Sequence, residues 1–472
     1  MRSDRNQWWI FKKNLKVRKK GISLLVDRDL VILFVFFMTM ILIFWRPRGV
    51  NEAFPATIGA LIILFVGGIS FQELTEIALN VTEASVTIIA TIVMAIVLES
   101  FRFFEWCAHR LAYKANGSGI RLFWYTNLLC FFMTVIFNND GSILITTPIL
   151  LLLLHHLRLK HHEKIPYLLS GALVATASSA PIGVSNIVNL IALKIVGMDL
   201  YMHTAMIFVP TVTGLLLMVS LLFFVFYKDI PKRVINVPKD ENFFIQSYHP
   251  LKPKMLPNVF KEKTSMMMKM LMFVIVVRIS LFVASFFEIS IGLVALFGSI
   301  VLLMVRWYKL RLSPIDVLKK APWSVFLFAF SMYIIVYGLK NIGLVTFFLQ
   351  LLKPLMTDVA SGIFWMGGLI TVLSNIFNNH PALMIGSMVL TNFGLDEITL
   401  KTAYLASIIG SDIGSLLLPI GTLATLLWMH ILKENGMKIG WAKYVKVTFV
   451  VIPPTLIFTM FCLYYWIKLL FV

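Results

Sequence analysis

Charged residues are scarce in this chain of 472 residues, at 14%, about half the share of an average soluble domain. The shortage excludes a soluble globular enzyme and a disordered chain, because both need a strongly polar surface. Hydrophobic residues make up 59%, and the mean hydropathy is +0.87. Apolar runs long enough to cross a bilayer recur along the whole chain. The sequence therefore predicts a polytopic membrane protein.

Cysteine is also scarce, and a nucleotide-binding loop is missing. Cys107, Cys130 and Cys462 are far apart and form no CxxC or zinc-like spacing, which excludes a disulfide framework. A three-thiol metalloid site is disfavoured because tight thiolate ligation would slow release. The sequence has no GxxxxGK[ST] loop, so it does not hydrolyse ATP through that device. We expect no metal site, no cofactor and no enzymatic activity.

Lys and Arg outnumber Asp and Glu by 42 to 23, which gives a net charge of +19. Residues 1–29 carry a net +6 and residues 228–269 a net +5. Basic segments that flank apolar runs face the cytoplasm and its anionic lipid. We therefore expect a basic cytoplasmic tail (1–29), a cytoplasmic N-terminus and a basic cytoplasmic loop (228–266). No folded basic domain is evident, so nucleic acid is not an expected partner.

The apolar runs fall into two halves, residues 30–227 and 267–472, on either side of the basic loop. We predict an all-α membrane protein with about 12 transmembrane helices. The first half has runs at 30–45, 54–70, 84–101, 120–137, 166–195 and 203–227, and the second at 268–286, 290–306, 322–340, 359–377, 402–432 and 443–470.

The two halves carry matching motifs in the same order. Ile136–Asp140 (IFNND) recurs as Ile376–His380 (IFNNH) at an offset of 240 residues, and Pro181–Gly183 (PIG) recurs as Pro419–Gly421 at an offset of 238. Two matches at nearly one offset are rarely a coincidence, even in a chain so rich in Ile and Phe. We therefore predict two structural repeats.

Two apolar stretches, residues 141–156 and 381–394, directly follow the paired asparagines. They are too short to cross a bilayer comfortably, and we interpret each as a re-entrant hairpin.

Helix-breaking residues interrupt one long apolar run in each half. Run 166–195 contains Ser178–Gly183, and run 402–432 contains Gly410–Gly414 and Pro419–Gly421. Proline removes a backbone donor and glycine admits irregular dihedrals, so both helices are expected to unwind there. Unwound backbone persists at bilayer depth only where it is buried in protein or lines a cavity. Repeated broken helices are typical of the substrate site of a secondary transporter.

Uncharged polar side chains gather around these features. Asn138, Asn139, Asn378 and Asn379 offer donors and acceptors without charge, and we interpret them as part of a neutral cage for a small hydroxylated solute or an ion. The alternative is that they only cap helix ends. For Ser185, Asn186, Thr422 and Thr425, which could complete the cage, the alternative is hydrogen bonding between helices. The remaining cage candidates are Gly183, Ser185, Asn186, Gly421, Thr422 and Thr425.

Ionisable residues inside a membrane are costly, and each is a functional candidate. Asp412 is the first candidate for carrying a coupling proton, because Gly410 and Gly414 are expected to break its helix on both sides. Asp140 is the second candidate, although it could equally cap a helix. His380 is the third, although a residue before proline could simply close a turn.

Seven motifs between Leu30 and the C-terminus carry a resemblance to a known family. They are FFEW (103–106), FNNDGSILITTPI (137–149), VSNIVN (184–189), APWSVFLFAFSMYIIVYGLKNIGL (321–344), FNNHPALMIGS (377–387), PIGTLATLLWMHILK (419–433) and IGWAKY (439–444). On these motifs the sequence resembles the ArsB family of arsenite/antimonite efflux proteins, within the wider ion-transporter superfamily. The 419–433 stretch is closer to the arsenite pumps than to the carboxylate carriers of that superfamily.

The resemblance implies secondary efflux of trivalent arsenic and antimony hydroxides across the bacterial plasma membrane, in exchange for protons. It also implies, for some members, a separate soluble ATPase subunit as partner, and a homodimer is one assembly to consider. A neutral trihydroxide suits a cage of amides and hydroxyls. The chain departs from the family at residues 177–179, where an acid is common, at His380, and at residues 415–417, where a basic residue is common.

Other functions of the same fold stay open. A sodium/proton antiporter is one alternative. A small-anion carrier is another, although the breaks contain no Arg or Lys to attract an anion. A scaffold without transport would not need broken helices. In the superfamily the repeats are inverted, whereas six spans per half would make them parallel, so one span is expected to be miscounted, within 30–70 or at 344–356.

Overall fold

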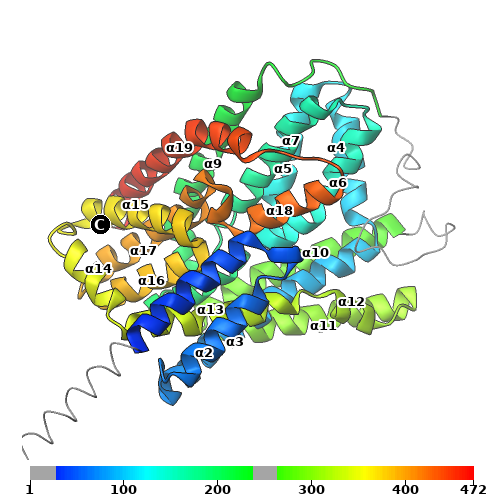
Figure 1. The fold of residues 1–472 in the computed structure, drawn as a ribbon. Helices are drawn as coiled ribbons and strands as arrows, with labels where there is room; N and C mark the ends of the chain where they lie inside the picture. The colour runs from blue at the N-terminus through cyan, green and yellow to red at the C-terminus, as the bar shows by residue number, and fades with distance from the viewer. Residues whose placement is uncertain (1–27, 238–262, 472) are drawn as a thin grey trace, which may run out of the picture. The chain divides into compact units, whose positions relative to one another are not determined.

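The computed structural model describes residues 28–237 and 263–471, so the basic tail before residue 28 and the centre of the basic loop lie outside the described residues. Within the described ranges the chain forms α-helices joined by turns and short 3-10 segments (Figure 1). Nine of the described helices are long and apolar enough to cross a membrane. The prediction of an all-α polytopic membrane protein is therefore confirmed.

Nine of the predicted spans coincide with these nine helices. The other three predicted spans are α2 (Ala53–Phe65), which is only 13 residues long, and the two runs that were expected to be broken. The nine are Arg28–Trp45, α3 (Phe71–Ser100), α5 (Gly119–Ile136), α9 (Leu200–Phe226), α10 (Lys263–Phe286), α11 (Ile291–Leu310), α13 (Trp323–Asn341) with the short α12 (Pro314–Lys320) before it, α15 (Val359–Phe377) and α19 (Trp441–Leu470).

Both breaks occur where proline and glycine predict them. The first run forms α7 (His161–Ala177) and α8 (Ile187–Val196), with the 3-10 turn η2 (Gly183–Ser185) between them. The second run forms α17 (Glu397–Asp412) and α18 (Leu423–Glu434), separated by η4 (Gly414–Leu417) and η5 (Pro419–Gly421).

The two stretches interpreted as re-entrant hairpins are single helices, and that interpretation was wrong. Residues 141–156 lie within α6 (Asn139–His156), and most of 381–394 lies within α16 (Asn379–Thr391). Each is the second arm of a helical hairpin whose first arm is α5 or α15, and the paired asparagines form the turn. The interpretation rested only on the short length of the two stretches. A stretch too short to cross the bilayer needs no turn of its own when the helix before it forms the other arm of the hairpin.

The order of elements is the same in the two halves. The series α5–α6–α7–α8–α9 is matched by α15–α16–α17–α18–α19, and each hairpin packs against the first segment of its own broken helix. Between the halves, α6 packs on α18, α16 packs on α8, and α9 lies along α19 (Figure 1). Exchanging the halves maps the α6–α18 pair onto the α16–α8 pair and the α9–α19 pair onto itself, which is what the predicted repeats require. Helices α7, α16 and α17 are buried along most of their length, so the breaks lie in the interior.

The chain divides into two compact units. The smaller one contains the described residues up to Leu79 together with Ser324–Phe348. Within it, the Tyr337 hydroxyl donates to Oε1 of Glu76 at 2.7 Å. The larger unit contains the other described residues, including α4 (Phe103–Ala115) and every candidate site residue, and the boundary after Phe348 divides α14 (Leu344–Leu352).

Gly410 does not break its helix, contrary to the prediction. Helix α17 is continuous through Gly410 and ends at Asp412. A Cβ on Gly410 would lie 2.5 Å from the carbonyl oxygen of Gly367 in α15, and a Cβ on Gly414 would lie 2.1 Å from Oγ1 of Thr371. Gly410 therefore allows α17 to approach α15 closely, and the break starts only after Asp412.

Candidate functional site

The two broken helices meet at the carboxylate of Asp412, which is the last residue of α17 and is fully buried. Oδ2 accepts hydrogen bonds from Ser179 Oγ and Asn189 Nδ2, both at 2.7 Å. Oδ1 accepts one from Asn186 Nδ2 at 3.1 Å. The donors lie just after α7 and at the start of α8. One carboxylate from the second half is thus held by three donors from the first half.

All three donors to Asp412 are neutral. No Lys, Arg or His among the described residues forms an ion pair with this carboxylate. An acid paired with a buried cation would leave that cation uncompensated when it bound a proton. Asp412 can exchange a proton without that cost, so its surroundings suit a proton carrier.

The asparagines at the two hairpin turns cap the helices that follow them. Asn138 Oδ1 accepts from the N–H of Gly141 at 2.5 Å, and Asn378 Oδ1 accepts from the N–H of His380 at 3.3 Å. Asn378 Nδ2 also donates to the carbonyl oxygen of Ile420 at 3.2 Å, inside the second break. Asn378 thus joins the second hairpin turn to the second break.

Two further cage candidates are also N-caps. Asn186 Oδ1 accepts from the N–H of Val188 at 3.2 Å at the start of α8, and Thr422 Oγ1 accepts from the N–H of Thr425 at 3.0 Å at the start of α18. Four of the predicted site residues therefore cap four buried helix N-termini. Capping does not exclude a contact with a solute, and it has a chemical consequence: helix N-termini favour negative charge and oxygen lone pairs.

Asp412 and its three donors, Ser179, Asn186 and Asn189, form the Asp412 cluster. The other predicted residues at the hairpin turns lie outside it. Asn139 and Asn379 are buried at the first positions of α6 and α16, and Asn139 Oδ1 accepts from the N–H of Asp140 at 2.8 Å. Asp140 is half-buried and His380 is buried, each in the first turn of its helix. Neither forms a hydrogen bond with Asp412.

The two PIG motifs differ in how closely they are packed. A Cβ on Gly421 would lie 1.9 Å from the carbonyl oxygen of Ser415, so only glycine fits between η4 and η5. A Cβ on Gly183 would lie 3.4 Å from Nε2 of His203, which is close to ordinary contact.

Three residues of the site were missed from the sequence. Ser179 and Asn189 donate to Asp412, and Asn375 holds the second break by donating to Gly414 O at 2.9 Å and accepting from Leu418 N–H at 2.8 Å. Asn189 carried a usable signal, because it lies three residues after Asn186 and so on the same helix face. Ser179 carried none beyond being a polar residue in a break, and Asn375 none beyond being a polar residue three positions before Asn378.

Several buried polar atoms beside the Asp412 cluster have no hydrogen-bond partner within the described residues. They lie in the two broken segments or on a residue that contacts Asp412. Such atoms are few in native proteins and often mark a ligand site. They are Ser185 Oγ, Asn189 Oδ1 and Ser415 Oγ.

A metal centre is not apparent in the part of the chain that the structure describes. It contains no group of three or more His, Cys, Asp or Glu side chains placed to hold an ion. The site is therefore a buried group of neutral polar side chains around a single acid.

Two broken helices that meet at a buried acid within an all-α membrane protein are typical of the class of membrane transporters. The family model for ArsB, the arsenical pump membrane protein, matches residues 31–467. The chain belongs to this family, which makes it a membrane transport protein and not an enzyme.

Several relatives match over nearly their whole length. A Bacillus subtilis (strain 168) protein, provisionally named an arsenical pump membrane protein, is 56% identical over 92% of this chain and 99% of its own. Arsenical pump membrane proteins of Escherichia coli and Yersinia enterocolitica are each 28% identical over 90% of this chain and 96% of their own.

Proposed function

We propose that the protein exports trivalent arsenic and antimony hydroxides across the cell membrane in exchange for protons, and that Asp412 carries the proton. The observation that supports this most directly is the Asp412 carboxylate, held by three neutral donors from the opposite broken helix. The family match and the names of the relatives support an arsenical as the substrate.

The substrate competes with the proton for Asp412. The hydroxyls of a neutral trihydroxide donate to the ionised carboxylate, and its oxygens accept from amide and hydroxyl donors such as Asn186, Asn189 and Ser185. A proton bound by Asp412 removes one acceptor and the negative charge, which weakens these contacts and releases the solute. The ionised site then carries the solute outward and the protonated site returns empty.

The exchange is driven by the proton gradient. One neutral solute leaves and one proton enters in each cycle, so one positive charge moves inward. The membrane potential then contributes about 2.3 kcal/mol per 100 mV for each cycle. Export of a neutral solute without this exchange would gain nothing from the potential.

Orientation and partners complete the proposal. The N-terminus and the basic loop 228–266 face the cytoplasm, as the positive-inside rule requires. Inverted repeats, a homodimer and a separate soluble ATPase subunit are further expectations that come from the family resemblance.

Everted membrane vesicles from an arsenite-sensitive bacterial host test the proposal, because export appears as uptake into such vesicles. We expect wild-type vesicles to concentrate arsenite when a proton gradient is applied, and the Asp412→Asn variant to lose at least about 90% of this accumulation. Asparagine retains the shape of the side chain. Its new NH2 group can face Asn189, whose Oδ1 has no other partner in the described residues and can turn to accept.

The matched control is Asp396→Asn, at the exposed start of the same helix. It also removes one carboxylate but retains a capping side chain, so accumulation should equal that of the wild type. Gradient-driven accumulation by Asp412→Asn would assign the proton to Asp140 or His380. Sodium-driven proton exchange by wild-type vesicles, without arsenite uptake, would favour the sodium/proton antiporter.

A further inference from the structure

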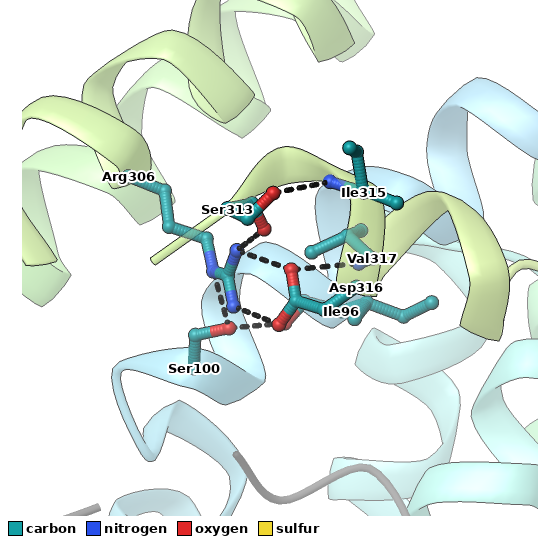
Figure 2. A network of polar contacts seen from close by, with 7 residues as sticks. All are labelled: Ile96, Ser100, Arg306, Ser313, Ile315, Asp316 and Val317. Carbon is teal, nitrogen blue, oxygen red and sulfur yellow. Dashed lines mark hydrogen bonds and ion pairs between the residues drawn. The ribbon is translucent and has the colours of Figure 1, made fainter. Parts of the chain in front are cut away.

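Two arginines are buried in the larger unit, and their surroundings differ sharply. Arg306 in α11 is 1% exposed, and all of its guanidinium nitrogens are used (Figure 2). Nε donates to Ser100 Oγ at 2.9 Å, and the terminal nitrogens donate to both carboxylate oxygens of Asp316 at 2.9 and 2.7 Å. One of them also donates to the carbonyl oxygen of Ser313 at 3.1 Å. Arg306 is a fully satisfied structural ion pair.

Arg278 in α10 is 7% exposed but forms a single hydrogen bond. Its Nε donates to the carbonyl oxygen of Ile136, the last residue of α5. Neither terminal nitrogen hydrogen-bonds any described residue, Asp140 included. The guanidinium thus lies at the turn of the first hairpin with two unpaired nitrogens side by side.

A buried guanidinium without a counter-charge is costly. An arginine within a membrane helix is costly to insert, and buried charges are normally paired. If Arg278 served only to cap the end of α5, a neutral side chain with one hydrogen-bond donor would be enough. The planar fork of two terminal nitrogens matches two oxygen atoms of one anion.

We propose that Arg278 is the cationic group of a binding position for a small oxyanion at the turn of the first hairpin. The bound anion accepts from both terminal nitrogens of the fork and neutralises the buried charge. At the adjacent turn Asn138 and Asn139 are buried and neutral, and the acid that follows them, Asp140, is half-buried and does not hydrogen-bond the fork. This position is separate from Asp412 and does not depend on arsenite being the substrate.

Thermal unfolding of the purified full-length protein tests this, with nitrate as the probe and gluconate, which is too large for a buried position, holding the ionic strength constant. For the wild type we expect saturating nitrate to raise the unfolding midpoint by about 3 °C or more. Arg278→Gln should lose this increment. Arg278→Lys retains the charge but not the fork, and should need roughly tenfold more nitrate for half of the effect.

The matched control is Arg306→Gln. It removes a buried arginine whose partners are all within the protein, so it should lower the starting midpoint but leave the nitrate increment unchanged. Asp412→Asn should also retain the increment. A wild-type midpoint that does not respond to nitrate, or an equal increment in Arg278→Gln, would overturn the proposal. If Arg278→Gln does not fold, the wild-type response and the Arg278→Lys titration still decide the question.

Discussion

The two breaks have matching motifs but contribute different chemistry. The first supplies hydrogen-bond donors, Ser179, Asn186 and Asn189, and contains no acid. The second supplies the acid, Asp412, at the end of a helix packed through glycine against α15. The repeats have therefore diverged into a donor side and an acceptor side.

The two breaks also differ in how tightly they are held. In the second break, Asn375 bonds to the backbone at both ends of η4, and Gly421 has room for no side chain. In the first break, Gly183 is close only to side chains. The acid thus has a fixed position, while the donors lie in a segment with more room. The predictions below test this difference, from the largest effect to the smallest.

Gly421→Ala should have the largest effect. Its Cβ would lie 1.9 Å from the Ser415 carbonyl oxygen, so the backbone of η4 or η5 must move, at a cost of about 3 kcal/mol or more. We expect little monodisperse protein after detergent extraction and no arsenite accumulation in vesicles. Gly183→Ala is the control in the matching motif and should remain folded and monodisperse, because its Cβ would lie 3.4 Å from Nε2 of His203. If both alanine variants folded equally well, the second break would not be packed more tightly than the first.

Ser179→Ala should reduce transport strongly without unfolding the protein. A hydrogen bond to a charged group contributes about 1.5–3 kcal/mol, so we expect roughly 10- to 100-fold lower vesicle uptake. Ser178→Ala is the control, because the Ser178 hydroxyl donates to Val174 O within its own helix at 2.6 Å and not to Asp412. Similar rates for the two alanine variants would mean that the Ser179–Asp412 contact has no role in transport.

Asn375→Ala should mainly lower stability. The substitution leaves the Gly414 carbonyl and the Leu418 N–H without partners in the interior, at about 1–3 kcal/mol for each group. We expect a midpoint of thermal unfolding lower by several degrees, with residual uptake in proportion to the folded protein. Asn375→Asp retains the acceptor for Leu418 and should lie between alanine and the wild type. A wild-type midpoint for Asn375→Ala would show that the second break holds its shape without this residue.

Asp396→Ala should have the smallest effect, confined to the exposed end of α17. The hydrogen bond from the Thr399 N–H holds the pKa of Asp396 below its usual value of 3.8. Its contribution to stability is therefore complete above pH 3.8 and is lost as the pH falls through the lowered pKa. We expect a midpoint lower by about 1–2 °C at pH 7, and a difference from the wild type that becomes smaller as the pH falls below 3.8. A larger effect at low pH than at pH 7 would contradict the expected direction of this pH dependence.

The fold was predictable because its signals are local. Proline and glycine marked both breaks, and the paired asparagines marked both hairpin turns. Two errors had the same origin, since length and composition do not say what packs against a segment. Residues 141–156 needed α5 as their other arm, and Gly410 needed α15 as its close neighbour.

The site was predictable only in part. Asp412 stood out as an acid in an apolar run, and Asn186 as an amide after a break. The contact between them joins residues 226 positions apart, and a single sequence does not encode which distant donor meets which acceptor. Ser179, Asn189 and Asn375 were missed for that reason. Whether the predicted cage and proton-coupling residues act in transport stays a prediction.

The separation of the donors from Asp412 also has a consequence for synthesis of the chain. Ser179, Asn186 and Asn189 leave the ribosome 223 to 233 residues before Asp412. At about 5–20 residues per second, they wait roughly 10–50 s in the membrane without their acceptor. A nascent chain that stops within this interval carries an incomplete set of buried polar groups. Membrane proteases and chaperones can recognise such unmatched donors. The hydrogen bonds to Asp412 therefore also distinguish a completed chain from an incomplete one.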